Sequence, residues 1–254
     1  MYSIMKNKIF TLFIVSLLFG MTSCELFEPD NFPVPDARVF GGIRDVEGGA
    51  LVETDLNNGT KIGTYELGGY ESPELRNWVV MQNGEYRNNL VYPNTYKIVF
   101  TDCNFFPFTI DEVTFKSGDN PLDFTVTPYI RIKNCKIVQD GDFVKATFNL
   151  EPGKSTVKLA SLNLYVFTDK FVGEYVKLSP SKGKGTPSRS YSTPATIDPN
   201  QVYELSIDLA ANKAGVLKTN RNYYFRVGAK ASQSGVGTIR ANYAPYVKIP
   251  LALN

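Results

Sequence analysis

Short runs rich in Tyr, Phe, Val, Thr and Ile alternate with turn-forming residues along the whole 254-residue chain. No window keeps a hydrophobic period of 3.6 residues, so no long amphipathic helix is expected. β-Branched and aromatic residues favour strands, while Gly, Asn, Asp and Pro favour the turns between them. Asn58-Gly59 and Asn83-Gly84 each lie between such runs, and Asn-Gly accepts the positive φ angles of tight hairpins. The pattern therefore predicts an all-β protein of short strands.

The strand-like runs fall into two groups, which predicts two tandem β-sandwich domains. The first group spans residues 37–127, with strands expected at 37–43, 61–67, 78–82, 96–101, 108–115 and 122–127. The second spans residues 128–254, with strands expected at 130–138, 143–150, 159–168, 175–178, 202–209, 223–230 and 246–251. Residues 222–229 alternate aromatic and polar side chains in the way that late strands of fibronectin-type sandwiches do.

Three connecting segments carry their own expectations. Residues 127–130 are interpreted as a short hinge between the two domains. Residues 179–194 are rich in Ser, Pro, Gly and Lys, which predicts a long flexible loop. Residues 210–218 are expected to form one or two helical turns between strands.

The N-terminus has the order of an export signal, and residues 1–23 are predicted to be a lipoprotein signal peptide. Lys6 and Lys8 precede an apolar run at residues 9–19, which is too short for a stable membrane span. Small residues then stand directly before Cys24, the expected site of lipid attachment and membrane anchoring. An ordinary signal peptide with a chance cysteine is the alternative. Residues 24–36 are acidic and contain proline, as expected of a tether.

The composition excludes several chemistries. The chain has no histidine, which removes Ser-His-Asp and Cys-His nucleophile systems and the usual zinc and iron ligand sets. Removing residues 1–23 takes away two of 27 basic side chains and no acids, so 25 basic side chains face 25 acidic ones. This balance gives no bulk attraction to nucleic acid. We expect no cofactor and no metal.

Two cysteines, Cys103 and Cys135, remain besides the lipid-attachment residue. Neither belongs to a C-x-x-C motif, and they fall in different predicted domains. An exported protein meets an oxidising compartment, which permits a disulfide. Two separate thiols and one bridge both remain open.

Several segments together resemble a known family: residues 39–43 with Gly48-Gly49, the run from Asn83 to Ile98, and above all the joint at residues 124–132. They are similar to an uncharacterised two-domain lipoprotein family of Bacteroidetes, a domain of unknown function encoded beside SusC/SusD-type importers. The resemblance implies a carboxypeptidase-regulatory, transthyretin-like first domain and an immunoglobulin-like second domain. It also implies a nutrient-uptake context, with a SusC-like TonB-dependent barrel and a SusD-like lipoprotein as partners, and it supplies no catalytic residues.

The acidic residues that follow Cys24 also resemble the surface-export signal of Bacteroidetes lipoproteins. This resemblance implies an outer-membrane, lipid-anchored protein that faces the cell exterior.

Trp78, the only tryptophan, is the centre of the candidate ligand site. An exposed aromatic platform stacks on the apolar face of a sugar, and Tyr70, Asn77 and Tyr86 are the expected companions of Trp78. The alternative is that Trp78 packs into the sandwich as an ordinary strand residue.

Acidic and amide residues at Asp45, Glu47, Asp55, Asn57 and Asn58 place oxygen atoms in loops, as a calcium site requires. Their spacing lacks the carboxylate at the twelfth position of an EF-hand loop, and turn formation is the ordinary explanation.

Two further sets of charges have both a functional and an ordinary interpretation. Lys182, Lys184 and Arg189 make the 179–194 segment basic, which suits either a partner contact or a solvated loop. Asp111 and Glu112 are adjacent, so in a strand they point to opposite faces and cannot form a glycosidase pair.

These observations favour a non-catalytic cell-surface lipoprotein, an accessory of a SusC/SusD-type importer that captures a glycan or peptide. The alternative is a structural or adhesive lipoprotein that acts as a spacer or docking arm. A hydrolase is disfavoured because the sequence contains no recognisable nucleophile or carboxylate pair.

Overall fold

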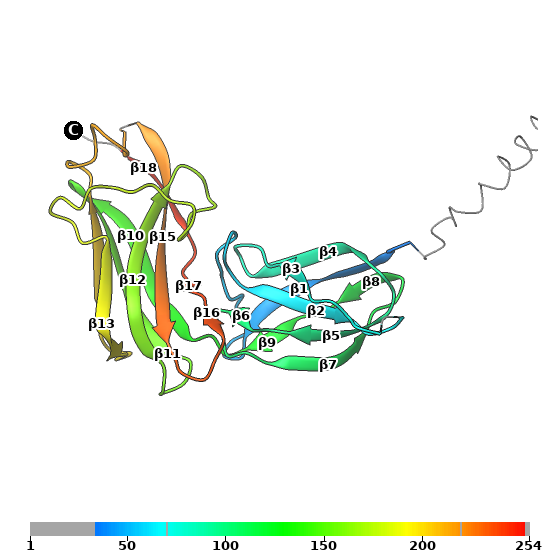
Figure 1. Cartoon of the computed structure of the whole chain (residues 1–254). Coiled ribbons are helices and arrows are strands. Elements are labelled where there is room, and N and C mark those ends of the chain that lie inside the picture. Colours follow the sequence, from blue (N-terminus) through cyan, green and yellow to red (C-terminus); the bar gives the residue numbers. More distant parts are fainter. Residues whose placement is uncertain (1–33, 70, 219, 252–254) are drawn as a thin grey trace, which may run out of the picture. The chain divides into compact units, whose positions relative to one another are not determined.

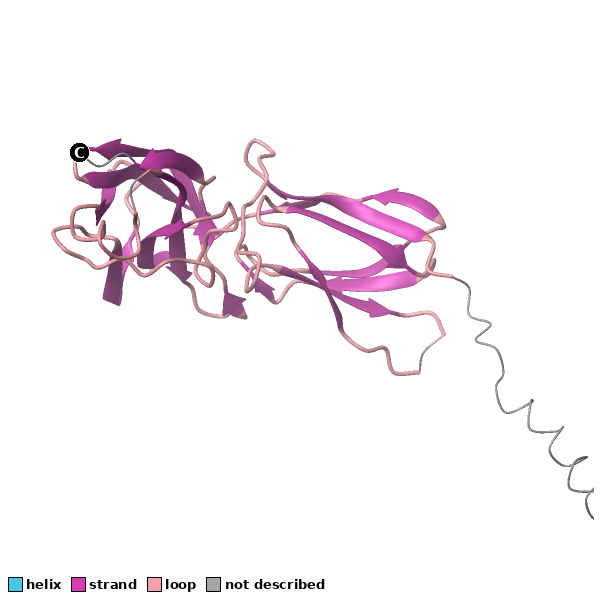
Figure 2. Ribbon diagram, turned by 90° about the horizontal axis from the view of Figure 1, so that it is seen from above, coloured by secondary structure: helices cyan, strands magenta, loops and turns pink. Residues whose placement is uncertain are grey.

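The computed structural model describes residues 34–69, 71–218 and 220–251, and within these ranges the chain consists of strands, turns and loops (Figure 1; Figure 2). The protein is therefore all-β, with two tandem sandwiches. The predicted signal peptide, Cys24 and residues 24–33 of the predicted tether lie outside the described residues.

The first sandwich contains two sheets that enclose one core. One sheet has the order β4-β1-β8, with β9 also paired to β1, and the other has the order β3-β2-β5-β7. β1 runs antiparallel to β4 but parallel to β8 and β9. The buried residues Ile43, Ile62, Ile98 and Phe124 belong to the core between the sheets. The strands are β1 (Ala37–Asp45), β2 (Lys61–Glu66), β3 (Arg76–Val79), β4 (Glu85–Val91), β5 (Thr95–Val99), β6 (Asp102–Cys103), β7 (Thr109–Thr114), β8 (Gly118–Pro121) and β9 (Phe124–Val126).

The second sandwich has a three-stranded sheet, β10-β11-β14, and a sheet of order β13-β12-β15-β17 in which β18 also pairs with β15. Alternate residues of β11 are buried between the sheets, as expected of a strand with one face in a core, whereas β12 and β15 contain segments, 164–166 and 225–229, that are buried on both faces. The strands are β10 (Ile130–Asp140), β11 (Phe143–Pro152), β12 (Lys158–Phe167), β13 (Ser188–Thr196), β14 (Tyr203–Asp208), β15 (Arg221–Ser232), β16 (Thr238–Ile239), β17 (Asn242–Tyr243) and β18 (Val247–Leu251).

Three expected segments differ from the structure, and one long strand was not expected. β4 was not expected, and the predicted loop at 179–194 is wrong from residue 188 onward, where β13 pairs with β12. Both strands lie at sheet edges, where one side needs no strand partner and polar residues or Pro194 are tolerated. Residues 175–178 form no strand, although the Leu178 amide donates to the Val166 carbonyl. Residues 210–218 form turns and no helix.

The connection at residues 127–130 is fixed to both sandwiches, contrary to the expected hinge. Tyr129 and Ile130 are each only 1% exposed, and Pro128 forms a β-bridge with Phe105. The Ile130 amide donates to Asn242 Oδ1 at 3.1 Å. Residues 35–254 accordingly form one compact unit.

Across the described ranges, no helix is long and apolar enough to span a membrane.

Candidate functional site

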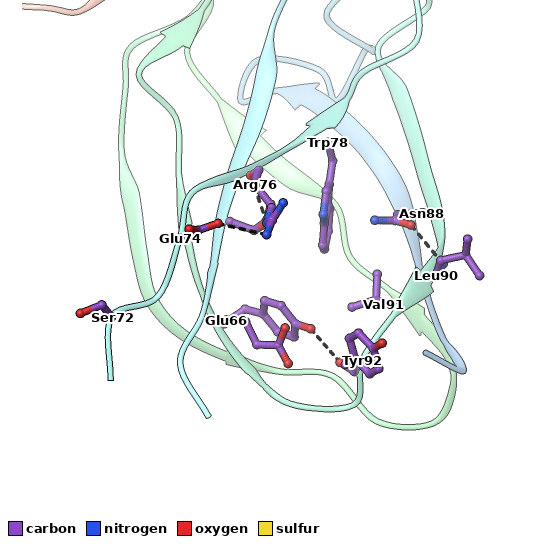
Figure 3. A pocket seen from close by; sticks show the side chains of 11 residues that line it. Glu66, Ser72, Glu74, Arg76, Trp78, Asn88, Leu90, Val91 and Tyr92 are labelled. Carbon is purple, nitrogen blue, oxygen red and sulfur yellow. Dashed lines mark hydrogen bonds and ion pairs between the residues drawn. The ribbon is translucent and has the colours of Figure 1, made fainter. Parts of the chain in front are cut away.

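A cavity of about 610 Å³ opens at one edge of the first sandwich, between β3 of one sheet and β4 of the other. Its volume lies within the range of small-molecule sites. The lining combines aromatic, aliphatic, charged and amide side chains (Figure 3): Thr64, Glu66, Ser72, Glu74, Arg76, Trp78, Asn88, Leu90, Val91, Tyr92 and Tyr96.

The cavity forms because β3 and β4 diverge from a common turn. Near the turn, Val80 and Tyr86 form an antiparallel bridge. Beyond it, β3 pairs with β2 and β4 pairs with β1, so the two strands enter different sheets. Side chains that point to one face recur at every second position of a strand. The inward residues of β3 and β4 therefore line the widening gap, with Trp78 opposite Asn88 next to the bridge.

Trp78 is partly buried and packs against the core of the first sandwich while it lines the cavity. Its ring centroid lies 6.0 Å from that of Phe115 and 6.5 Å from those of Tyr86 and Tyr96. These distances are typical of packed aromatic pairs, so the core fixes the indole in place. Trp78 thus combines the two interpretations of the sequence, as a core residue and as an aromatic wall.

Polar groups surround the indole. Arg76 and Asn88 lie on either side of Trp78 in Figure 3. Arg76 forms an ion pair with Glu74 at 3.1 Å, and both side chains are more than 70% exposed. Asn94 Nδ2 donates to Glu66 Oε1 at 2.8 Å and to the Gly68 carbonyl at 2.9 Å. The cavity therefore offers one aromatic surface with hydrogen-bond donors and acceptors around it.

Of the four residues that were expected to bind a ligand, only Trp78 lines this cavity. Asn77 is exposed but precedes Trp78 in β3, so its side chain points to the other face of the sheet. Tyr86 is 2% exposed, its hydroxyl donates to the Leu122 carbonyl at 2.6 Å, and burial raises its pKa. Tyr70 lies outside the described residues.

Glu66, Glu74, Arg76 and Asn88 line the cavity but were not among the expected site residues. The sequence does contain a signal for Arg76 and Asn88. Arg76, Trp78 and Asn88 all have even numbers, so in two strands joined by the turn at Asn83-Gly84 their side chains point to the same face. This signal becomes apparent only when residues 85–91 are recognised as a strand.

The acidic residues considered for calcium bind protein groups instead. Arg131 donates to both carboxylate oxygens of Asp45, at 2.5 and 2.7 Å. Burial alone would raise the pKa of Asp45, but the hydrogen bonds from Arg131 and from the Glu47 amide lower it overall. Asp55 accepts hydrogen bonds from the Asn57 and Glu174 amides and from the Tyr243 hydroxyl. In the described ranges, no cluster of three or more Cys, Asp or Glu side chains is arranged to hold a metal ion.

Two of the other charged candidates contact protein groups through their side chains. Arg189 lies in β13 and donates to the Glu204 carbonyl, whereas Lys184 bonds Asp208 only through its backbone amide, at 2.8 Å. Asp111 pairs with Lys97 at 3.0 Å.

Cys103 and Cys135 are free thiols, so the structure contains no bridge between them. Burial raises the pKa of Cys103 to about 12 and that of Cys135 to about 11. Both thiols are therefore protonated and poorly nucleophilic at neutral pH.

Comparison with known proteins gives a consistent set of relatives. The profile "Domain of unknown function (DUF3823_C)" matches residues 130–248. A Bacteroides uniformis crystal structure, described as a candidate carbohydrate-binding protein, is 45% identical with a TM-score of 0.80, and the match covers 85% of this chain and all of that one.

More distant structures share the fold. A DUF3823 protein from Bacteroides uniformis is 15% identical with a TM-score of 0.68, the match covering 86% of this chain and all of that one. A DUF3823 protein from Parabacteroides merdae is 19% identical with a TM-score of 0.64, at 85% and 100% coverage. No curated protein matches the chain.

Proposed function

The chain belongs to the DUF3823 family, and from this premise we propose that it is a non-catalytic surface lipoprotein that captures a glycan in the cavity between β3 and β4. Sugar binding requires an apolar surface for the C–H face of a pyranose ring and polar groups for its hydroxyls. The position of Trp78 supports this proposal most directly, because the core holds its ring beside Arg76 and Asn88. The relative described as a candidate carbohydrate-binding protein supports the same ligand class.

The chemistry of the cavity favours binding over hydrolysis. A glycosidase needs two carboxyl groups on opposite sides of the scissile bond, one of them acting as an acid. Glu74 is exposed and paired with Arg76, whereas Glu66 is held by Asn94. Both carboxylates are thus placed to accept hydrogen bonds from sugar hydroxyls.

A matched pair of variants tests the cavity. Trp78→Ala removes the stacking surface and is expected to weaken glycan binding about tenfold or more, since an aromatic contact is worth roughly 1 kcal/mol beyond the area it buries. Asn77→Ala, on the opposite face of the same strand, should bind like the wild type. Ligands are found on a glycan array, and affinities are measured by calorimetry.

Because Trp78 also packs in the core, Trp78→Phe is included and thermal unfolding is followed for all variants. Unchanged affinity in a folded Trp78→Ala protein would refute the assignment of this cavity.

We place the protein on the outer face of the outer membrane, anchored through Cys24, beside a SusC-like barrel and a SusD-like lipoprotein. The export signal and the family resemblance support this placement. Exposed apolar side chains on the edge strands are available for partner contacts: Val79, 63% exposed, on the outer face of β3, and Leu90, 75% exposed, at the cavity on β4. They also favour the second candidate function, a protein-docking arm.

Purification of the C-terminally tagged full chain from detergent-solubilised outer membranes tests the partners. We expect a SusC-like barrel and a SusD-like lid to co-purify in stoichiometric amounts, and Cys24→Ala to release the protein from the membrane. Recovery of the lipoprotein alone, where barrel and lid stay together, would exclude a stable complex.

A further inference from the structure

The charges that line the cavity between β3 and β4 do not balance. Glu66, Glu74 and Arg76 are the only Asp, Glu, Lys or Arg side chains among its described lining residues. They give two negative charges and one positive charge. The lining therefore has a net charge of −1.

The single positive charge is already engaged. Arg76 Nη2 lies 3.1 Å from Glu74 Oε2, so this pair is close to neutral towards a ligand. Glu66 has an uncharged partner, the Asn94 side-chain amide. Among the ion pairs of the described residues, none involves Glu66. The uncompensated charge therefore belongs to Glu66.

The Glu66 carboxylate is also held in place. Asn94 Nδ2 donates to both Glu66 Oε1 and the Gly68 carbonyl, while Asn94 Oδ1 accepts from the Thr95 amide at 2.8 Å. Only Oε1 takes part in this network, so the second oxygen remains available to accept a ligand hydroxyl. The carboxylate cannot withdraw from an approaching anion without breaking its hydrogen bond from Asn94.

We infer that the cavity selects uncharged glycans over anionic ones, and that Glu66 is the specificity-determining residue; this inference rests on the proposed function. Hydroxyl groups of a neutral sugar donate to the carboxylate, and charge-assisted hydrogen bonds of this kind are the stronger ones. A uronate or sulfate group would instead bring a second negative charge next to Glu66. Juxtaposed like charges disfavour the wrong partner and thereby produce specificity.

The test uses oligosaccharide pairs that differ only in the group at C6, hydroxymethyl or carboxylate: glucan and glucuronan, galactan and galacturonan, mannan and mannuronan. We expect wild-type protein to bind the neutral member of a recognised pair about tenfold more tightly at low salt. Added salt should narrow the ratio, because it screens charges in a cavity open to solvent.

Glu66→Gln keeps the shape of the side chain and removes its charge, so it should reduce the preference to within about threefold. Glu112→Gln removes an exposed carboxylate of β7 that does not line the cavity, and should leave the preference unchanged.

Equal or tighter binding of the uronates by the wild type would overturn the inference and leave glycan capture standing. A preference that survives Glu66→Gln would overturn the assignment to Glu66. If no oligosaccharide binds in the array or in any of the pairs, the proposed function itself fails and the inference fails with it.

Discussion

Arg226 has the largest of the fully buried side chains among the described residues, and it is 0% exposed. Its guanidinium donates to Glu53 Oε2 at 2.7 Å, to the Thr54 carbonyl at 2.9 Å and to the Ala244 carbonyl at 3.0 Å. It also lies 4.2 Å from the centre of the Tyr243 ring. Burial lowers the pKa of Arg226 and raises that of Glu53, and their pairing opposes both effects. A buried charge is tolerated here because each of its hydrogen-bonding groups has a partner.

Arg226→Met is expected to lower the free energy of unfolding by about 3–5 kcal/mol, because it leaves Glu53 and several carbonyls buried without their donor. Arg221→Met changes an exposed arginine at the start of the same strand and should alter stability by less than about 0.5 kcal/mol. Urea unfolding followed by tryptophan fluorescence and circular dichroism measures both. A loss below about 1 kcal/mol for Arg226→Met would contradict the role assigned to the buried network.

The turn between β3 and β4 determines where these two strands begin to diverge. Gly84 adopts φ +86°, its amide donates to the Met81 carbonyl, and its carbonyl accepts from the Ile43 amide. A Cβ atom at Gly84 would lie 2.6 Å from the backbone oxygen of Val52. Only glycine therefore satisfies both the backbone angle and the close approach of the neighbouring segment.

Gly84→Ala and Gly48→Ala form a matched pair that separates these two requirements. Gly48 has φ +82°, but no atom lies within 4 Å of the point that a Cβ would occupy, so its substitution costs the left-handed conformation alone, about 1 kcal/mol. Gly84→Ala should cost at least about 1 kcal/mol more, because the Val52 backbone must also move. Chemical unfolding midpoints provide the comparison, and equal losses would argue against the contact.

Among the longer strands, sequence reasoning missed two polar edge strands, β4 and β13, although the edge strands β7 and β10 were expected. The inner strands could be predicted because a continuous core requires apolar residues at alternate positions, as in β11. β4 contains Arg87-Asn88-Asn89, and β13 is mostly Ser, Thr and Arg, because an edge strand exposes more of its surface. Their polar composition is that of a loop, and only hydrogen bonding to β1 and β12 distinguishes them.

The same limit applied to the candidate site. Trp78 could be selected as the only tryptophan, but Asn88 lies on β4 and Glu66 at the end of β2, both distant from Trp78 in the sequence. Proximity along the sequence suggested Asn77, although side-chain alternation directs it to the other face. A site formed by two sheets requires knowledge of which strands border the gap.

At the scale of the whole described unit, the two sandwiches share a polar seam. β6 and β16 pair in parallel, and Arg240 donates to Asp102 at 2.5 Å. Asn242 Nδ2 donates to the Asn104 carbonyl at 2.8 Å. The family profile matches only the second sandwich, while the candidate cavity belongs to the first. The solved structures, which match 85–86% of the chain and include the relative at 45% identity, extend the comparison into the first sandwich.

Because β3 and β4 diverge into different sheets, packing in the interior of the first sandwich affects the width of the cavity at its edge. Each wall of the cavity belongs to a different sheet. The side chains packed between those sheets therefore set the distance between the two walls. Phe115, which packs against Trp78 without lining the cavity, is one of these side chains. A larger or smaller residue at position 115 would change the width of the opening without altering any residue that lines it. Substitutions in the interior of the first sandwich therefore change the size of the cavity, even where every surface residue stays the same.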